Sequence, residues 1–130
     1  MQEPVTTTAR ARISDREARY LLAILARGGR EVRSVDLALY LGVQKSSVSA
    51  MLSRLVAHDL VWKESYGKVS LTDDGRERAV KLRDSLRETE EYLARTLALS
   101  GEHLEKVALA MVLAGGSCVV QAIRATASND

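Results

Sequence analysis

The stretch SVDLALYLGVQKSSVSAMLS, residues 34–53, decides the fold of this 130-residue chain. Its spacing matches a helix-turn-helix, in which a small residue lies where the helices touch and a glycine follows in the turn. Ala38 and Gly42 meet these two requirements, and we expect helices over residues 35–41 and from about residue 45 to residue 58. Apolar side chains hold the positions that must be buried, namely Leu37, Leu41, Val43, Val48 and Met51.

The flanking segments predict one more helix and a hairpin. Ser14 and Glu17 have the spacing of a capping box that begins a helix, and Gly28-Gly29 can end that helix. Residues 60–64 and 68–71 have the pattern of two short strands that turn around Tyr66-Gly67. Because this hairpin directly follows the helix-turn-helix, we interpret it as a wing.

The C-terminal part predicts a long helix followed by apolar helices. Thr72 can cap the long helix, and Ser100-Gly101 can break it. Residues 107–123 then form a run of 17 residues without a charged side chain. This run is shorter than the roughly 20 residues of a membrane span. We therefore expect no membrane span, and helices that are buried against a second copy of the chain.

Together these elements predict a mainly α protein with a small β-hairpin wing. We expect residues 1–13 to be a flexible N-terminal arm, residues 14–72 a winged helix-turn-helix DNA-binding domain, and residues 73–130 a long linker helix with a helical dimerisation region. The N-terminus has no secretory signal pattern, which indicates a cytoplasmic protein. The predicted dimerisation residues are apolar, namely Leu109, Val112, Leu113, Val119 and Val120.

The net charge of +2 is unevenly distributed along the chain. Residues 1–72 carry eleven Lys and Arg against seven Asp and Glu, whereas residues 73–130 carry eight against ten. A basic part beside an acidic part is typical of a protein in which one surface meets phosphate and another does not. A chance fluctuation is the alternative explanation.

The outward face of the second helix of the helix-turn-helix indicates contact with DNA. Its short polar side chains can approach the major groove closely. A merely solvated face is the alternative, but serines favour helix formation poorly, and so three of them at one helix start favour a contact role. The predicted DNA-binding residues, including two from the wing, are Gln44, Lys45, Ser46, Ser47, Ser49, Ala50, Ser53, Arg54, Tyr66 and Lys68.

The composition argues against several other kinds of site. One Cys and two His exclude a disulfide framework and a structural zinc site, and they form no catalytic pattern, so we do not expect an enzyme. We expect Cys118 to be a buried small apolar residue or, alternatively, a redox switch that pairs across a dimer. We expect His58 to end a helix or to lie near a phosphate. At the start of a predicted helix we expect carboxylates that interact with the positive end of the helix dipole; the alternative is a metal site. The residues concerned are Glu102, His103 and Glu105.

Several stretches, together with Ala79, resemble the DtxR/MntR family of metal-responsive repressors: VRSVDLA at residues 32–38, QKSSVS at residues 44–49 and LTDDG at residues 71–75. The last element is shared with winged-helix regulators of the MarR type. The resemblance implies a homodimer that represses genes of metal homeostasis when Mn²⁺ or Fe²⁺ drives DNA binding. The short length is similar to that of manganese-type members, which lack a C-terminal barrel domain.

The resemblance also implies metal ligands on the first helix, the long helix and the helix after it. The matching positions here are residues 20–23, Leu86 and residues 108–114, which are almost entirely apolar. Apolar side chains supply no ligand to a divalent transition metal ion. We therefore predict no cofactor, and a metal-sensing site that is lost or altered.

The sequence thus predicts a sequence-specific transcriptional regulator, a repressor, whose partners are double-stranded DNA and a second copy of itself. Two alternatives stay open. One is a winged-helix module that binds a protein partner, and the other is a metal-responsive regulator with relocated ligands.

Overall fold

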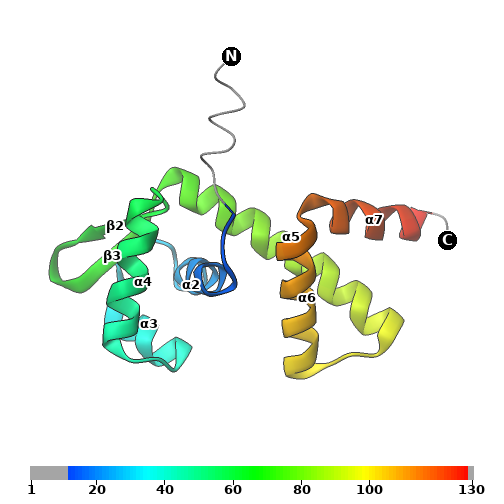
Figure 1. Cartoon of the computed structure of the whole chain (residues 1–130), viewed down its shortest axis with the longest axis horizontal. Helices are drawn as coiled ribbons and strands as arrows, with labels where there is room; N and C mark the ends of the chain where they lie inside the picture. The colour runs from blue at the N-terminus through cyan, green and yellow to red at the C-terminus, as the bar shows by residue number, and fades with distance from the viewer. Residues whose placement is uncertain (1–11, 129–130) are drawn as a thin grey trace, which may run out of the picture. The chain divides into compact units, whose positions relative to one another are not determined.

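The computed structural model describes residues 12–128, so most of the predicted N-terminal arm lies outside the described residues. The protein is mostly helical with a small antiparallel sheet (Figure 1), which confirms the predicted fold class. The elements in chain order are α2 (Asp15–Ala26), β1 (Val32–Arg33), α3 (Ser34–Leu41), α4 (Lys45–Ala57), β2 (Val61–Glu64), the single 3-10 turn η1 (Ser65–Gly67), β3 (Lys68–Leu71), α5 (Asp73–Leu97), α6 (Gly101–Gly115) and α7 (Ser117–Ser128). The chain divides into two compact units between Ala79 and Val80, within α5.

Helix α2 begins at the predicted capping box. The Ser14 hydroxyl accepts the Glu17 N–H at 3.1 Å, and the Glu17 carboxylate accepts the Ser14 N–H at 2.9 Å, so both amides are satisfied at the helix start. The helix ends before Gly28-Gly29, as predicted, and both glycines have positive φ. Its inner face places Leu21 and Ile24 fully inside the core of the first unit.

Helices α3 and α4 form the predicted helix-turn-helix. Gly42 ends α3 in the left-handed conformation with φ of 69°, which a side chain with a Cβ rarely adopts. The core of this unit contains Leu37, Ala38, Val48 and Met51, while Leu41 and Val43 are partly buried against it. The predicted burial pattern is therefore confirmed at three of the five apolar positions and met in part at the other two.

The wing is part of a three-stranded sheet, not of an isolated hairpin. The strand order is β1-β3-β2, and Val32 of β1 pairs with Val69 of β3. The Glu31 N–H supports this pairing by donating to the Ser70 hydroxyl at 2.8 Å. A strand of two residues is too short to show an alternating pattern, which is why the sequence predicted only the hairpin.

The second unit comprises the rest of α5 together with α6 and α7. Its buried side chains include Leu93, Leu109 and Ile123. Helices α6 and α7 are bent by 111° at a break next to Gly116. Within residues 12–128 no single helix is both long and apolar enough to cross a membrane, and only α6 and α7 taken together, with the bend between them, have the required length and composition.

An exposed ion pair joins two helices of the second unit. The Arg124 guanidinium on α7 donates to both oxygens of the Glu88 carboxylate on α5, at 2.7 and 3.1 Å. This hydrogen-bonded arginine holds the pKa of Glu88 below its ordinary value of 4.5. Because the pKa is lower in the folded state, the pair stabilises the unit above about pH 4.5, and its contribution is lost as the pH falls through the folded pKa.

We expect Glu88→Gln to remove this pH-dependent contribution. The melting temperature of the variant should lie below that of the parent protein at pH 7, and the difference should shrink at pH 3, where more of the parent carboxylate is protonated than at pH 7. Thermal melts followed by circular dichroism at the two pH values measure this difference. Glu91→Gln, at an exposed position on the same helix, is the matched control. A difference that is the same at both pH values would contradict the assignment.

Candidate nucleic-acid interface

Helix α4 presents the predicted polar face to solvent. Val48, Met51, Leu52 and Leu55 are buried, and their burial turns the opposite side of the helix outward. Ser47 is half-buried. The other predicted residues of this helix and its N-cap are exposed: Gln44, Lys45, Ser46, Ser49, Ala50, Ser53 and Arg54. The structure therefore gathers the α4 residues of the prediction on one accessible side.

The start of α4 is suited to an anion. Gln44 is the N-cap residue and makes no side-chain capping hydrogen bond. The first amides of a helix have no partner inside the helix and carry the positive end of the helix dipole. Ser46 and Ser47 lie in this first turn and add hydroxyl donors. Amides and hydroxyls together can bind a phosphate oxygen.

The wing lies beside α4 and supplies two further predicted residues. Tyr66 at its tip is 96% exposed and has a left-handed φ of 62°. Lys68 is half-buried, and its ammonium lies 3.5 Å from the Glu31 carboxylate. Lys63 of β2 donates to the Ser53 hydroxyl of α4 at 3.4 Å, so the wing contacts the helix directly. Helix and wing thus form one surface.

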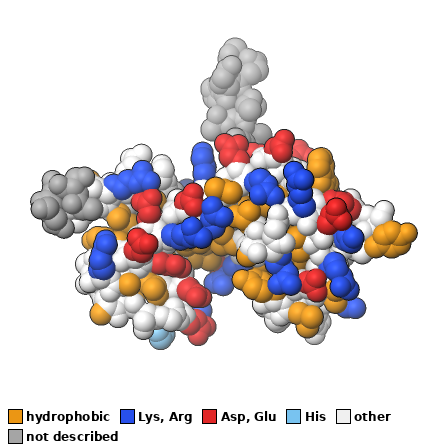
Figure 2. Space-filling view, turned by 180° about the vertical axis from the view of Figure 1, so that it is seen from behind, with side chains coloured by type: hydrophobic (Ala, Val, Ile, Leu, Met, Phe, Trp, Pro, Cys, Tyr) orange, Lys and Arg blue, Asp and Glu red, His pale blue; other side chains and the backbone are white. Residues whose placement is uncertain are grey.

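The face shown in Figure 2 has no single large area of positive charge. On the face shown in Figure 2, Lys and Arg side chains are interspersed with Asp and Glu side chains. On α4 itself, the cations available for a DNA contact are Lys45 and Arg54, which are both exposed.

A buried carboxylate connects α2 to the end of α4, and the sequence did not predict this contact. Glu17 is only 2% exposed, and its second oxygen accepts no hydrogen bond from the described residues. That oxygen lies 3.2 Å from His58 Nδ1 and 3.9 Å from Arg54 Nε. His58 caps the C-terminal end of α4, as one of its two interpretations predicted. The capping-box spacing identified Glu17, but no sequence signal marks a partner about forty residues away.

We expect Glu17→Ala to destabilise the protein by about 2 kcal/mol, because it removes half of the capping box and the carboxylate beside His58. Urea denaturation measures the change in the free energy of unfolding. Asp15→Ala is the matched control: Asp15 belongs to the same helix turn, and its ion pair with Arg19 is exposed. An exposed pair of this kind contributes about 0.5 kcal/mol or less. Equal losses in the free energy of unfolding for the two substitutions would show that the buried contact of Glu17 adds no stability beyond that of an exposed ion pair.

The implied metal does not fit the side chains that occupy the matching positions. Leu86 is half-buried, and residues 108–114 offer no nitrogen or oxygen ligand. Among residues 12–128, no three His, Cys, Asp or Glu side chains lie together in a way that could hold a metal ion. Glu102 at the start of α6 is instead paired with Lys106 at 3.1 Å. The absence of a cofactor stays a prediction.

Cys118 does not have the predicted location. It is exposed in the first turn of α7, just after the bend at Gly116. The prediction of burial was wrong because an uncharged run does not determine which side of each helix faces inward. The bend separates the run into two helices, each with an inner and an outer face.

The predicted dimerisation residues divide into two groups. Leu109, Val112 and Val120 are buried within the single chain, whereas Leu113 and Val119 are half-buried. Apolar area that is accessible to a partner lies in a depression of about 360 Å³ in the second unit, and Val119 is the residue of the predicted set that lines it. Its lining residues are Tyr92, Met111, Cys118, Val119, Ala122, Ile123 and Thr126.

Solved structures with the same fold include several regulators. The structure of the manganese regulator SloR is 21% identical, with a TM-score of 0.75, and the match covers 88% of this chain and 54% of that one. The structure of ScaR with bound Zn²⁺ is 20% identical, with a TM-score of 0.69, and the match covers 88% of this chain and 54% of ScaR. The hypothetical protein SSo2273 from Sulfolobus solfataricus is 21% identical, with a TM-score of 0.66, and the match covers 90% of this chain and 91% of SSo2273. At this identity the similarity shows the fold.

The chain spans about half the length of SloR and ScaR. No curated protein gives a significant match. A family profile does match residues 5–77, more than half of the chain and nearly all of the first unit. The protein belongs to the family described as Domain of unknown function (DUF8462).

Proposed function

We propose that the protein is a dimeric, sequence-specific DNA-binding transcriptional regulator, with α4 in the major groove and the wing on the phosphate backbone. The observation that carries this proposal is the exposed polar face of α4, which the buried side chains of the same helix hold outward. Its short side chains let the helix approach base edges closely. The winged-helix fold shared with SloR and ScaR supports the proposal.

We further propose that the protein is a repressor that does not depend on the metal ion implied by the DtxR/MntR resemblance. Leu86 and the segment 108–114 support this part, because their side chains offer none of the nitrogen or oxygen ligands that such an ion needs. DNA binding should therefore respond to a signal other than Mn²⁺ or Fe²⁺.

Fluorescence anisotropy with DNA from upstream of the protein's own gene tests both parts. We expect specific binding that is unchanged by a chelator and that weakens steeply with salt, since each neutralised phosphate adds about 0.9 to the logarithmic salt slope. A strict Mn²⁺ or Fe²⁺ requirement, with bound metal found by elemental analysis, would favour relocated ligands. DNA binding that depends on neither sequence nor salt would contradict the proposal.

A protein-interaction module is the second candidate, favoured by exposed apolar side chains on α3. Leu39 is 78% exposed, and the neighbouring Tyr40 ring is exposed with the Arg27 guanidinium 5.7 Å from its centroid. Exposed apolar groups of this size are frequent in protein contact surfaces. Loss of partner binding in Leu39→Ser with DNA binding retained would assign this surface to a protein.

We expect Val119→Glu to convert the dimer to a monomer. Val119 is half-buried and lines the apolar depression of the second unit, so a partner would have to bury the introduced charge unpaired. Light scattering should give a mass near 14.2 kDa for the variant and near twice that value for the parent protein. Ala94→Glu, which adds the same charge at an exposed position of α5, is the matched control.

Val119 is a better test of the dimer than Leu109 or Val112, because a charge at either of those buried residues would also disrupt the packing of the single chain. A variant mass that stays at the dimer value, with unchanged circular dichroism, would place the interface elsewhere.

A further inference from the structure

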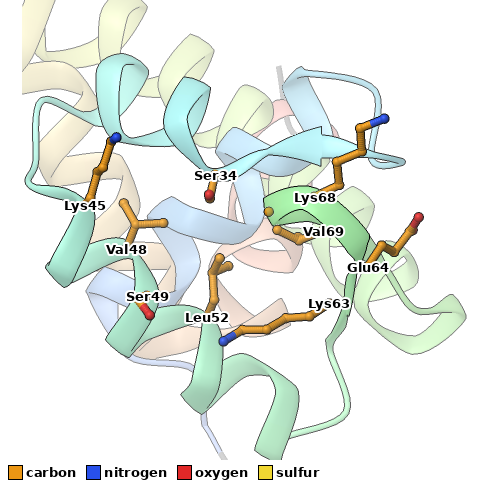
Figure 3. Close-up of a pocket in the computed structure, with 10 residues that line it drawn as sticks. Ser34, Lys45, Val48, Ser49, Leu52, Lys63, Glu64, Lys68 and Val69 are labelled. Carbon is orange, nitrogen blue, oxygen red and sulfur yellow. The ribbon is translucent and has the colours of Figure 1, made fainter.

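A cavity of about 290 Å³ lies between α4 and the wing. Figure 3 shows Val48 and Leu52 of α4 and Val69 of β3 converging on it from opposite sides. The hydroxyl of Ser34, at the start of α3, points toward the same space. We call this space the wing cavity. It belongs entirely to the first unit.

The wing cavity combines an apolar interior with cations at its edge. Lys45 of α4 and Lys63 of β2 line it from two sides, and the hydroxyl-bearing Ser49 lies between them on α4. Apolar contact area with a few polar groups at defined positions is the usual composition of a small-molecule site. A ligand that matches this pattern has an apolar body and one negatively charged end.

The charges on the lining residues favour an anion. Within the described part of the chain, neither the Lys45 nor the Lys63 ammonium is paired with a carboxylate. Glu64 also lines the cavity, but its carboxylate already accepts a hydrogen bond from the Ser70 hydroxyl. Lys68 is paired with Glu31. Two lysine ammonium groups are therefore left for a bound anion.

We propose that the wing cavity binds a small aromatic carboxylate whose ring contacts Val48, Leu52 and Val69 and whose carboxylate meets Lys63 at the cavity edge. Its volume is at the lower end of the range for ligand sites, roughly 300–1,000 Å³, and suits a single ring. A DNA phosphate would match a lysine at the edge but would leave the apolar interior without a partner.

Occupancy of the wing cavity should oppose DNA binding, an inference that rests on the proposed function. Lys45, Ser49 and Lys68 line the cavity and are also predicted DNA contacts. A bound ligand occupies the surface that these residues would offer to DNA, and its carboxylate adds negative charge beside them. The ligand and DNA therefore compete for one surface, which makes the ligand an inducer.

Benzoate is the probe for the test, with acetate as the control for charge and benzylamine as the control for the ring. We expect benzoate to cause saturable NMR shifts of the Val48, Leu52 and Val69 methyl groups, whereas the two controls at equal concentration cause none. Lys63→Gln should weaken benzoate binding about fivefold or more, while Lys81→Gln, an exposed lysine on α5, should not change it. Saturating benzoate should weaken DNA affinity about tenfold.

The outcomes separate this inference from the proposed function. Absence of saturable methyl shifts, or equal shifts with all three probes, overturns the site even where DNA binds normally. Benzoate binding that leaves DNA affinity unchanged overturns the competition. Saturable, Lys63-dependent benzoate binding in a protein that does not bind DNA supports the site and contradicts the proposed function.

Discussion

Reversing the charges of Lys45 and Arg54 together should weaken DNA binding by about a hundredfold at moderate salt. Both side chains are exposed on the outward face of α4, one near its start and one near its end. Each replacement removes one attraction to phosphate and adds one repulsion, and about a tenfold loss per position is the expected size of such an effect. Anisotropy titrations of the Lys45→Glu, Arg54→Glu variant measure it.

The double variant Lys81→Glu, Arg87→Glu is the matched control, because it changes the net charge equally at exposed positions of α5. It should bind DNA within about threefold of the parent protein, since only the general attraction changes. A loss of equal size in both double variants would show that net charge matters and that the face of α4 does not.

Arg54 needs a second variant because Glu17 lies nearby. The buried Glu17 carboxylate lies 3.9 Å from Arg54 Nε. A glutamate at position 54 would therefore place a second carboxylate close to that of Glu17. The neutral pair Lys45→Gln, Arg54→Gln avoids this repulsion. It should weaken DNA binding about tenfold and reduce the logarithmic salt slope by about two. If the melting temperature of this variant is unchanged while its DNA affinity falls, the loss is due to missing DNA contacts and not to unfolding.

Gly75→Ala should lower the melting temperature by roughly 10 °C or more, corresponding to about 3 kcal/mol. Gly75 lies in the first turn of α5, where a Cβ would be 1.9 Å from the Leu60 carbonyl oxygen. This backbone atom cannot move aside easily, because the Leu60 oxygen also accepts the Thr72 N–H at 3.0 Å. The start of α5 must shift, and its contacts with the preceding segment are lost.

The sign of this effect makes the test specific. Alanine favours a helix interior over glycine by about 1 kcal/mol, so helix propensity alone predicts stabilisation. Thermal melting of Gly75→Ala and of Glu77→Ala, an exposed position in the same helix, distinguishes the two explanations. A Gly75→Ala variant that melts at or above the temperature of the parent protein would exclude the backbone clash.

This contact also explains the glycine of the LTDDG stretch at residues 71–75. The sequence predicted Thr72 of this stretch as the cap of the long helix but gave no reason for Gly75. In the structure Thr72 donates its hydroxyl to the Asp59 carbonyl at 2.7 Å and accepts the Gly75 N–H at 2.9 Å. The threonine therefore joins the start of α5 to the segment between α4 and β2, and the glycine permits the close approach of α5 to that segment.

The sequence predicted what depends on local spacing and missed what depends on distant partners. The helix-turn-helix was predictable because Ala38, Gly42 and the buried apolar positions lie within a few residues of one another. Strand β1 was missed because it has only two residues and because its partner strand, which contains Val69, is far along the chain. The proximity of Glu17 to His58 was missed for the same reason. The DNA contacts and the dimer interface stay predictions.

The pairing of β1 with β3 has a consequence for the order of folding. The hydrogen bond from Glu31 to Ser70 joins residues 39 positions apart, and the enclosed segment contains α3, α4 and β2. Closing such a loop has an entropic cost that contacts between sequence neighbours do not have. The two helices of the helix-turn-helix can therefore form before this sheet closes. Amide hydrogen exchange should then show sub-global opening in which β1 separates from β3 while α3 and α4 stay protected.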